Sequence, residues 1–202
     1  MSSLVFINPP HASGATSVAP FFPSKEVQLQ LIPHSLLSPL PQYPKLLYIV
    51  IMSKITVYLD NCAFNRPFDD QRQVRIFLEA QAKLHIQSLI ADDKLALACS
   101  YMSLYENNDN PHEERRASIA DFFGYVSQFT DHDKAKEVET KAAEIMKYGI
   151  ENKDAIHIAC AIAAGSNYFI TTDDELTKKY VGNEISICGP IEFIKILEEQ
   201  YE

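Results

Sequence analysis

The segment Ile55-Thr-Val-Tyr-Leu-Asp60 decides how this chain is interpreted, because an apolar run gives way at once to a carboxylate. Similar short runs recur at Leu95-Ala-Leu-Ala-Cys99, Tyr168-Phe-Ile-Thr-Thr172 and Glu184-Ile-Ser-Ile-Cys188. Such runs, separated by helical patterns, predict the buried strands of a parallel sheet with helices on both faces and right-handed crossovers. We therefore expect an α/β protein with a three-layer α/β/α arrangement and a mostly parallel central sheet.

Apolar periodicity and capping residues mark the helices expected between these strands. The helix from about Gln73 to Ile90 has an apolar stripe, which we expect to face the core rather than a partner: Val74, Phe77, Leu78, Ala82 and Leu89. A helix after Asn110-Pro111 is expected to turn Ile119, Phe122, Phe123 and Val126 to the core, and Thr130 and Asp133 are expected to cap the next one, 134–148. The remaining helices are expected over 103–107, 155–164, 174–180 and 191–199, with Gly149 and Gly165 as helix ends.

Four acidic residues lie where apolar segments become polar: Asp60, Glu106, Asp154 and Asp173. Asp60 and Asp173 directly follow expected strands, and the other two lie on helices that begin at the same edge of the sheet. In this class of fold the ligand site lies at the carboxyl ends of the strands. Four carboxylates gathered there repel one another unless a cation or a proton lies among them. The sequence therefore predicts a divalent-metal site.

Each of these acids also has a purely structural explanation when it is considered alone. Asp154 and Asp173 can be helix N-caps, and Ser103-Leu-Tyr-Glu106 fits the capping box S-x-x-E. Asp60 can be the first turn residue after a strand. Fold stability alone does not favour four acids at one edge, so the metal site is the stronger interpretation of the whole set.

The donor types predict which metal this site takes. Oxygen-only ligation is typical of Mg²⁺ or Mn²⁺, whereas zinc and copper usually recruit His or Cys. His157 lies one turn beyond Asp154, and we interpret it as a packing or hydrogen-bonding residue on the helix flank rather than as a ligand.

The first 51 residues differ in composition from the rest of the chain. They contain eight of the eleven prolines and only three charged residues, Lys25, Glu26 and Lys45. We expect residues 1–51 to be a Pro-rich, disordered extension or a mis-assigned start, with Met52 as the natural start of one domain over 52–202. The longest apolar run, 46–51, is far shorter than the roughly 20 residues of a membrane span, so we expect no membrane anchoring.

Charge and cysteine content restrict the function further. Residues 52–202 contain 16 basic and 26 acidic residues, a formal net charge of −10, which argues against a broad phosphate-binding surface but allows a local basic rim. Cys62, Cys99, Cys160 and Cys188 are too widely spaced for a zinc motif and are expected to be reduced thiols, which favours a cytoplasmic location.

The acidic segments carry a resemblance to a known family. Val57-Tyr-Leu-Asp60-Asn, Tyr105-Glu106, Lys153-Asp154-Ala-Ile-His-Ile-Ala and Ile170-Thr-Thr-Asp173-Asp resemble, in order and spacing, the motifs of PIN-domain ribonucleases. The resemblance covers most of residues 54–197, and bacterial members of similar length are toxins of VapBC-type toxin–antitoxin pairs. It implies a Mg²⁺- or Mn²⁺-dependent endoribonuclease in which Asp60, Glu106, Asp154 and Asp173 bind the metal and Thr171 and Thr172 support the site.

The chain departs from the family pattern in two places. Asn61 follows the first acid where the family often has Ser or Thr, and Asp174 and Glu175 are alternatives to Asp173. Neither departure removes a carboxylate, so activity is still expected. Candidates for RNA backbone contacts are six basic residues, of which Arg66 is favoured because its Pro-containing turn should lie beside the site: Arg66, Arg72, Arg75, Arg115, Arg116 and Lys153.

Other functions and the partners follow from the same residues. A haloacid-dehalogenase-like phosphatase is disfavoured because Cys62 stands where Asp-x-Asp would require a second acid, and a nucleotide-binding module because no Gly-rich loop occurs. A catalytically silent RNA- or protein-binding module remains the alternative. The expected partners are an RNA substrate, a second copy in a homodimer and a cognate antitoxin that would place an Arg or Lys among the carboxylates.

Overall fold

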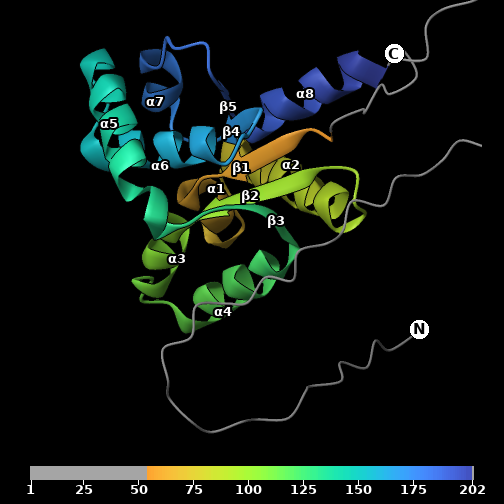
Figure 1. The fold of residues 1–202 in the computed structure, drawn as a ribbon. Helices are drawn as coiled ribbons and strands as arrows, with labels where there is room; N and C mark the ends of the chain where they lie inside the picture. Colours follow the sequence, from red (N-terminus) through yellow and green to blue (C-terminus); the bar gives the residue numbers. More distant parts are fainter. Residues whose placement is uncertain (1–53, 202) are drawn as a thin grey trace, which may run out of the picture.

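The computed structural model describes residues 54–201, and the expectations for residues 1–51 and for Met52 as the start lie outside this range. Five parallel strands form one sheet in the order β3-β2-β1-β4-β5 (Figure 1). They are β1 (Thr56–Leu59), β2 (Ala96–Ser100), β3 (Val126–Thr130), β4 (Tyr168–Ile170) and β5 (Ser186–Cys188). The expected α/β/α class with a parallel sheet is confirmed.

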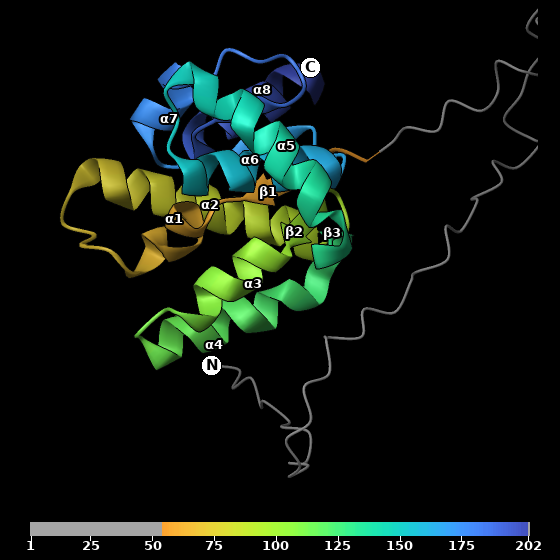
Figure 2. The same ribbon diagram turned by 60° about the vertical axis from the view of Figure 1, so that its left-hand side comes forward.

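Eight α-helices connect and cover these strands within the described range (Figure 2). They are α1 (Asn61–Asn65), α2 (Val74–Ala91), α3 (Tyr101–Asn108), α4 (Glu113–Phe122), α5 (Ala135–Ile145), α6 (Asn152–Ala163), α7 (Asp174–Lys179) and α8 (Pro190–Tyr201). Short 3₁₀ turns lie at Arg66–Phe68, Phe123–Tyr125, His132–Lys134 and Met146–Tyr148. None of the helices in residues 54–201 is long and apolar enough to cross a membrane.

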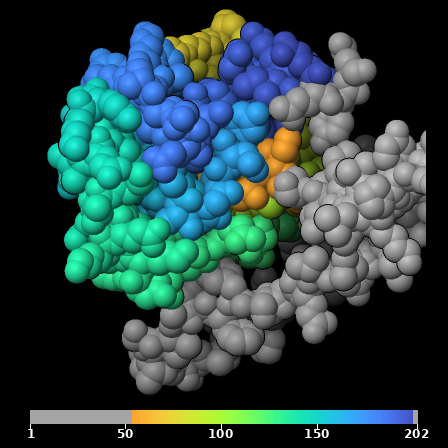
Figure 3. Space-filling view, turned by 45° about the horizontal axis from the view of Figure 1, so that its top comes forward, coloured from red at the N-terminus to blue at the C-terminus, as the bar shows by residue number. Residues whose placement is uncertain are grey.

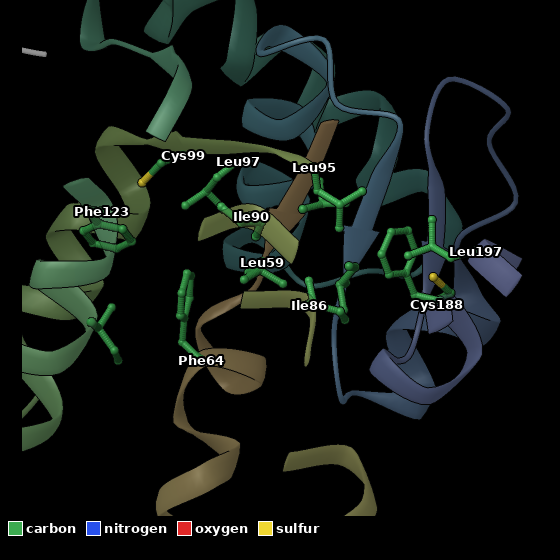
Figure 4. Close-up of a cluster of buried hydrophobic side chains, with 14 residues drawn as sticks. Leu59, Phe64, Ile86, Ile90, Leu95, Leu97, Cys99, Phe123, Cys188 and Leu197 are labelled. Atoms are coloured by element: carbon green, nitrogen blue, oxygen red, sulfur yellow. The ribbon is translucent and has the colours of Figure 1, made fainter. Parts of the chain in front are cut away.

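Alternation along the strands divides the core into two layers. In β1, Val57 and Leu59 pack on the side of α2 and α8, whereas Tyr58 packs on the side of α5 and α6. Figure 4 shows the first layer, where Leu59, Ile86 and Leu97 pack together. On the other side, α5, α6 and Leu176 of α7 pack against the sheet. Figure 3 shows the outer surface of α5 to α8, with a small orange patch from the start of the described chain beside it.

The segment 126–130 corrects one expectation. Val126 and Thr130 belong to edge strand β3, not to a helix face and a helix cap. Helix α4 ends at Phe122, and the 3₁₀ turn that contains Gly124 turns the chain into the strand. The fully buried Thr130 hydroxyl donates to the carbonyl of Cys160 at 2.8 Å, which joins the strand to α6.

Helix α2 corrects a second expectation, because much of its predicted core stripe faces outward. Val74, Phe77 and Leu78 are 73%, 45% and 48% exposed, although the helix also buries Ala80, Ile86 and Ile90. The rotation follows from two charged residues, Glu79 and Lys83, which lie on the buried side. Glu79 contacts two arginines, and the Lys83 ammonium lies 5.4 Å from the ring centre of Phe64.

Helix boundaries test the capping expectations. Gly149 and Gly165 end their helices with φ of 79° and 70°, as expected for residues in the left-handed region. The capping box at Ser103 and Glu106 is wrong, because α3 begins at Tyr101 and its N-cap is Ser100. The alternative of Asp154 as a cap is also wrong, since Glu151 occupies that position in α6.

Candidate metal centre

The carboxyl ends of β1, β2 and β4 bring the predicted acids to one edge of the sheet. Because β1 and β4 are neighbours in register, the Asp60 amide donates to the Ile170 carbonyl at 2.9 Å, and Asp60 lies beside Thr171. Helix α3 starts directly after β2 and brings Glu106 to the same edge. Helix α6 packs against α3 and contributes Asp154 and His157, one turn apart.

Asp60 is held in one orientation by hydrogen bonds to both of its carboxylate oxygens. Its Oδ1 accepts from the amide of Asn61 at 2.7 Å, which caps α1. Its Oδ2 accepts from the Thr171 hydroxyl at 2.8 Å and from the Cys62 thiol at 2.9 Å. Burial, and then the negative charge of Asp60, raise the pKa of Cys62 to about 12, so the thiol keeps its proton at neutral pH.

Asp60, Glu106 and His157 offer three ligand atoms within 4.8 Å of one another. Glu106 is 8% exposed, and its Oε1 contacts the ammonium of Lys153. Its Oε2 lies 3.0 Å from Nε2 of His157, yet the geometry does not make a hydrogen bond, so both buried atoms lack one. These two buried atoms are therefore available to a ligand bound beside them.

A buried hydrogen-bond network orients the His157 ring through Nδ1, the nitrogen that faces away from Glu106. Its Nδ1 lies 3.0 Å from the Tyr58 hydroxyl, which also contacts the hydroxyls of Ser100 at 2.7 Å and Ser103 at 2.6 Å. Burial lowers the pKa of His157, so the ring is neutral at pH 7. A neutral ring facing Glu106 favours the proton on Nε2 and leaves Nδ1 to accept from Tyr58. If Nε2 binds a cation instead, Nδ1–H donates to Tyr58, and the serine hydroxyls keep that oxygen satisfied.

Asp154 and Asp173 lie near this cluster. Burial, and then the charges of Asp60 and Asp173, raise the pKa of Asp154. Asp173 caps α7 through its Oδ1, which accepts from the amides of Glu175 at 2.8 Å and Leu176 at 3.1 Å. Thr171 links two of the acids, because its hydroxyl donates to Asp60 and accepts from the Asp173 amide at 3.1 Å.

The basic residues expected at the rim are largely engaged in other contacts. The Arg66 side chain is 17% exposed and is neutralised by Asp69 and Glu79, whereas Arg72 pairs with Asp70. Arg115 and Arg116 donate to backbone carbonyls. Lys153, 65% exposed and in contact with Glu106, is the basic side chain closest to the acids among these six.

A cavity of about 630 Å³ opens beside Asp173, which is the one of the four acids that lines it. Its walls come from α1, α2 and the segment after β4, and include Cys62, Arg66, Arg75, Glu79 and Asp173. A second cavity, of about 250 Å³, lies between α5 and α6 and is lined by none of the four acids.

The donor set fits a divalent cation. It offers carboxylate oxygens from Asp60 and Glu106. Asp154 and Asp173 lie close enough to add to the repulsion among these carboxylates, which a bound cation would relieve. Sequence reasoning treated His157 as a flank residue, but the structure places its Nε2 among the candidate donors. The sequence signal for this role was the position of His157 one helical turn after Asp154, on the same face of the helix.

An α/β/α fold with acids gathered at the carboxyl edge of its sheet defines a protein with a candidate divalent-metal centre. The sequence pattern of the PIN domain family matches residues 57–182, more than half of the chain. The protein therefore belongs to the PIN domain family, a fold that generally serves as a nuclease and usually binds divalent metal.

The chain is also similar to solved structures. PAE2754 from Pyrobaculum aerophilum is 16% identical, aligns over 73% of this chain and 91% of its own, and has a TM-score of 0.42. No curated protein matches the sequence.

Proposed function

We propose that this protein is a cytoplasmic, Mg²⁺- or Mn²⁺-dependent endoribonuclease that hydrolyses RNA phosphodiester bonds. One observation carries the proposal: Asp60, Glu106 and His157 converge within 4.8 Å, and the buried Glu106 Oε2 has no hydrogen bond. Together with the acids at Asp154 and Asp173, this arrangement supports a hard cation at the edge of the sheet.

Each residue has a distinct task in this proposal. Asp60 and Glu106 are the primary metal ligands, and Thr171 and Cys62 hold Asp60 in place through its Oδ2. Asp154 and Asp173 complete the acidic wall. When bound, the cation supplies Lewis-acid chemistry that neutralises charge on the scissile phosphate and makes water a better nucleophile.

Lys153 has two tasks that depend on whether the cation is bound. Its ammonium contacts Glu106 in the structure, where it offsets part of the acidic charge. A divalent cation competes with that contact. The released side chain, mostly exposed, can then bind a phosphate of the RNA backbone.

We also propose that the protein acts as the toxin of a type II toxin–antitoxin pair, and that it forms homodimers. The supporting observations are the acidic edge, which suits a basic side chain of an antitoxin, and the outward apolar residues of α2, which suit a second copy. Co-expression with the neighbouring small open reading frame tests the first idea, and sedimentation of the wild type against Leu78→Glu tests the second. Unimpeded growth of cells that express the protein alone would refute the toxin role. A wild type that sediments as a monomer would refute the homodimer.

The test of the nuclease compares RNA cleavage by the wild type, Asp154→Asn and Asp121→Asn. Asp121 lies exposed on α4 and serves as a control for the loss of one acid. We expect cleavage in Mn²⁺ by the wild type and the control, none with chelator, and a loss of at least a hundredfold in Asp154→Asn. No cleavage by the wild type in Mn²⁺ would favour the catalytically silent module instead. Equal products with and without chelator would refute the metal dependence, and equal rates for wild type and Asp154→Asn would refute the role of Asp154.

A further inference from the structure

A chain of ion pairs connects α2 to the segment that follows β4. Glu79 contacts two arginines, Nε of Arg75 at 2.7 Å and Nε of Arg66 at 2.8 Å. Arg75 binds the Asp174 carboxylate with both Nη atoms, each at 2.7 Å. Arg66 reaches the Thr172 carbonyl with Nη2 at 3.5 Å. Thr172 and Asp174, the residues on either side of Asp173, are therefore held by an arginine in the turn before α2 and by an arginine in α2.

The burial of Glu79 needs an explanation beyond fold stability. Its side chain is 8% exposed, whereas apolar residues of the same helix face outward. An apolar residue in place of a buried ion pair is often neutral or stabilising, so stability alone gives no reason for a glutamate here. Each carboxylate oxygen of Glu79 instead contacts one arginine, and Arg75 in turn binds Asp174 through two hydrogen bonds. Contacts of this kind fix geometry, which is what a metal ligand requires from its surroundings.

The position of the contacts indicates what they fix. Asp173 uses Oδ1 to cap α7, and its backbone amide is held by Thr171. Its remaining freedom depends on the backbone at 172 and on the first residue of α7, the two points that the arginines reach. We infer that Arg75, supported by Glu79, is a positioning residue that holds Asp173 at the metal centre; this inference rests on the proposed function.

Mn²⁺ affinity, measured by calorimetry on the full-length chain, tests this role without relying on activity. Arg75→Ala removes a positive charge near the acids, so electrostatics alone predicts tighter Mn²⁺ binding. Positioning predicts the opposite, a loss of about tenfold, in line with the effect of other residues that orient metal ligands. The matched control is Arg72→Ala. Arg72 lies three residues before Arg75 and pairs with Asp70, so this change removes the same charge from a different ion pair. We expect the control to stay within twofold of wild type.

A second background separates positioning from a general effect on the fold. In Asp173→Asn, the Arg75→Ala change should cost no further Mn²⁺ affinity, because the group it positions is already altered. Arg75→Lys should recover only part of the loss, since lysine cannot make the bidentate contact. Thermal melting in chelator, where Arg75→Ala and Arg72→Ala should agree within a few degrees, checks that both variants fold.

The outcomes distinguish this inference from the proposed function. If the wild type binds Mn²⁺ and cleaves RNA while Arg75→Ala binds Mn²⁺ as tightly or more tightly, the positioning role is refuted and the nuclease stands. An equal loss in the Asp173→Asn background also refutes it. A wild type that binds no Mn²⁺ refutes the proposed metal centre and the inference with it.

Discussion

Replacing Tyr58 with phenylalanine tests the network behind the metal centre. Tyr58 is 1% exposed, and its hydroxyl contacts Ser100, Ser103 and Nδ1 of His157. After Tyr58→Phe the two serine hydroxyls can still bond to each other, since they lie 3.4 Å apart. Nδ1 of His157 loses the hydrogen bond that it makes to Tyr58. Leaving one buried polar atom unsatisfied costs about 1–3 kcal/mol.

We therefore expect Tyr58→Phe to lower the free energy of unfolding by about 2 kcal/mol and the melting temperature by roughly 4–8 °C. Urea unfolding in chelator measures this loss without a metal contribution. Tyr105→Phe is the control, because Tyr105 is 62% exposed on α3 and its change should stay within about 0.5 kcal/mol. If Tyr58→Phe is as stable as this control, the hydroxyl does not hold the network together and the argument fails.

Three further changes test separate parts of the site. Asp154→Asn should stabilise the metal-free protein at pH 7.5 and lose most of that advantage at pH 4. The fold raises the pKa of Asp154, so the stability of the wild type falls as the pH rises from the ordinary pKa of 3.8 through the raised one. Urea titrations that give the same stability difference between variant and wild type at both pH values would contradict this. Lys153→Ala should tighten Mn²⁺ binding several-fold and raise the KM for RNA, with a shallower salt dependence; a weaker Mn²⁺ complex would show that Lys153 supports the site rather than competes for it. Cys62→Ser should keep cleavage within about threefold of wild type because the hydroxyl can still donate to Asp60, whereas Cys62→Ala should lose about tenfold; identical rates for the two variants would exclude a role for this hydrogen bond.

The sheet was predictable because its central strands are continuous apolar runs. The edge strand β3 was not, since Ser127 and Gln128 are exposed and the spacing of Ile119, Phe122, Phe123 and Val126 continues a helical period into it. Tertiary pairing with β2 overrides that local pattern.

The orientation of α2 depended on side chains from other elements. Periodicity favours burying Val74, Phe77 and Leu78, but it contains no information on Arg66 and Phe64, which contact Glu79 and Lys83 on the opposite side. Charged residues that find partners inside can rotate a helix against its apolar stripe.

The edge of the sheet that holds the candidate site was predictable, because parallel topology alone brings strand-end residues such as Asp60 and Asp173 to one edge. The third donor of the central cluster, His157, and the network through Tyr58 depend on distances between side chains of β1, β2, α3 and α6. No linear pattern in the sequence encodes those distances.

The location of a bound ion tests the central claim most directly. Crystals of the protein soaked in Mn²⁺ and measured at the manganese absorption edge reveal where the metal binds. We predict an anomalous peak about 2.1 Å from carboxylate oxygens of Asp60 and Glu106. A peak elsewhere, or none at millimolar Mn²⁺, would contradict the account.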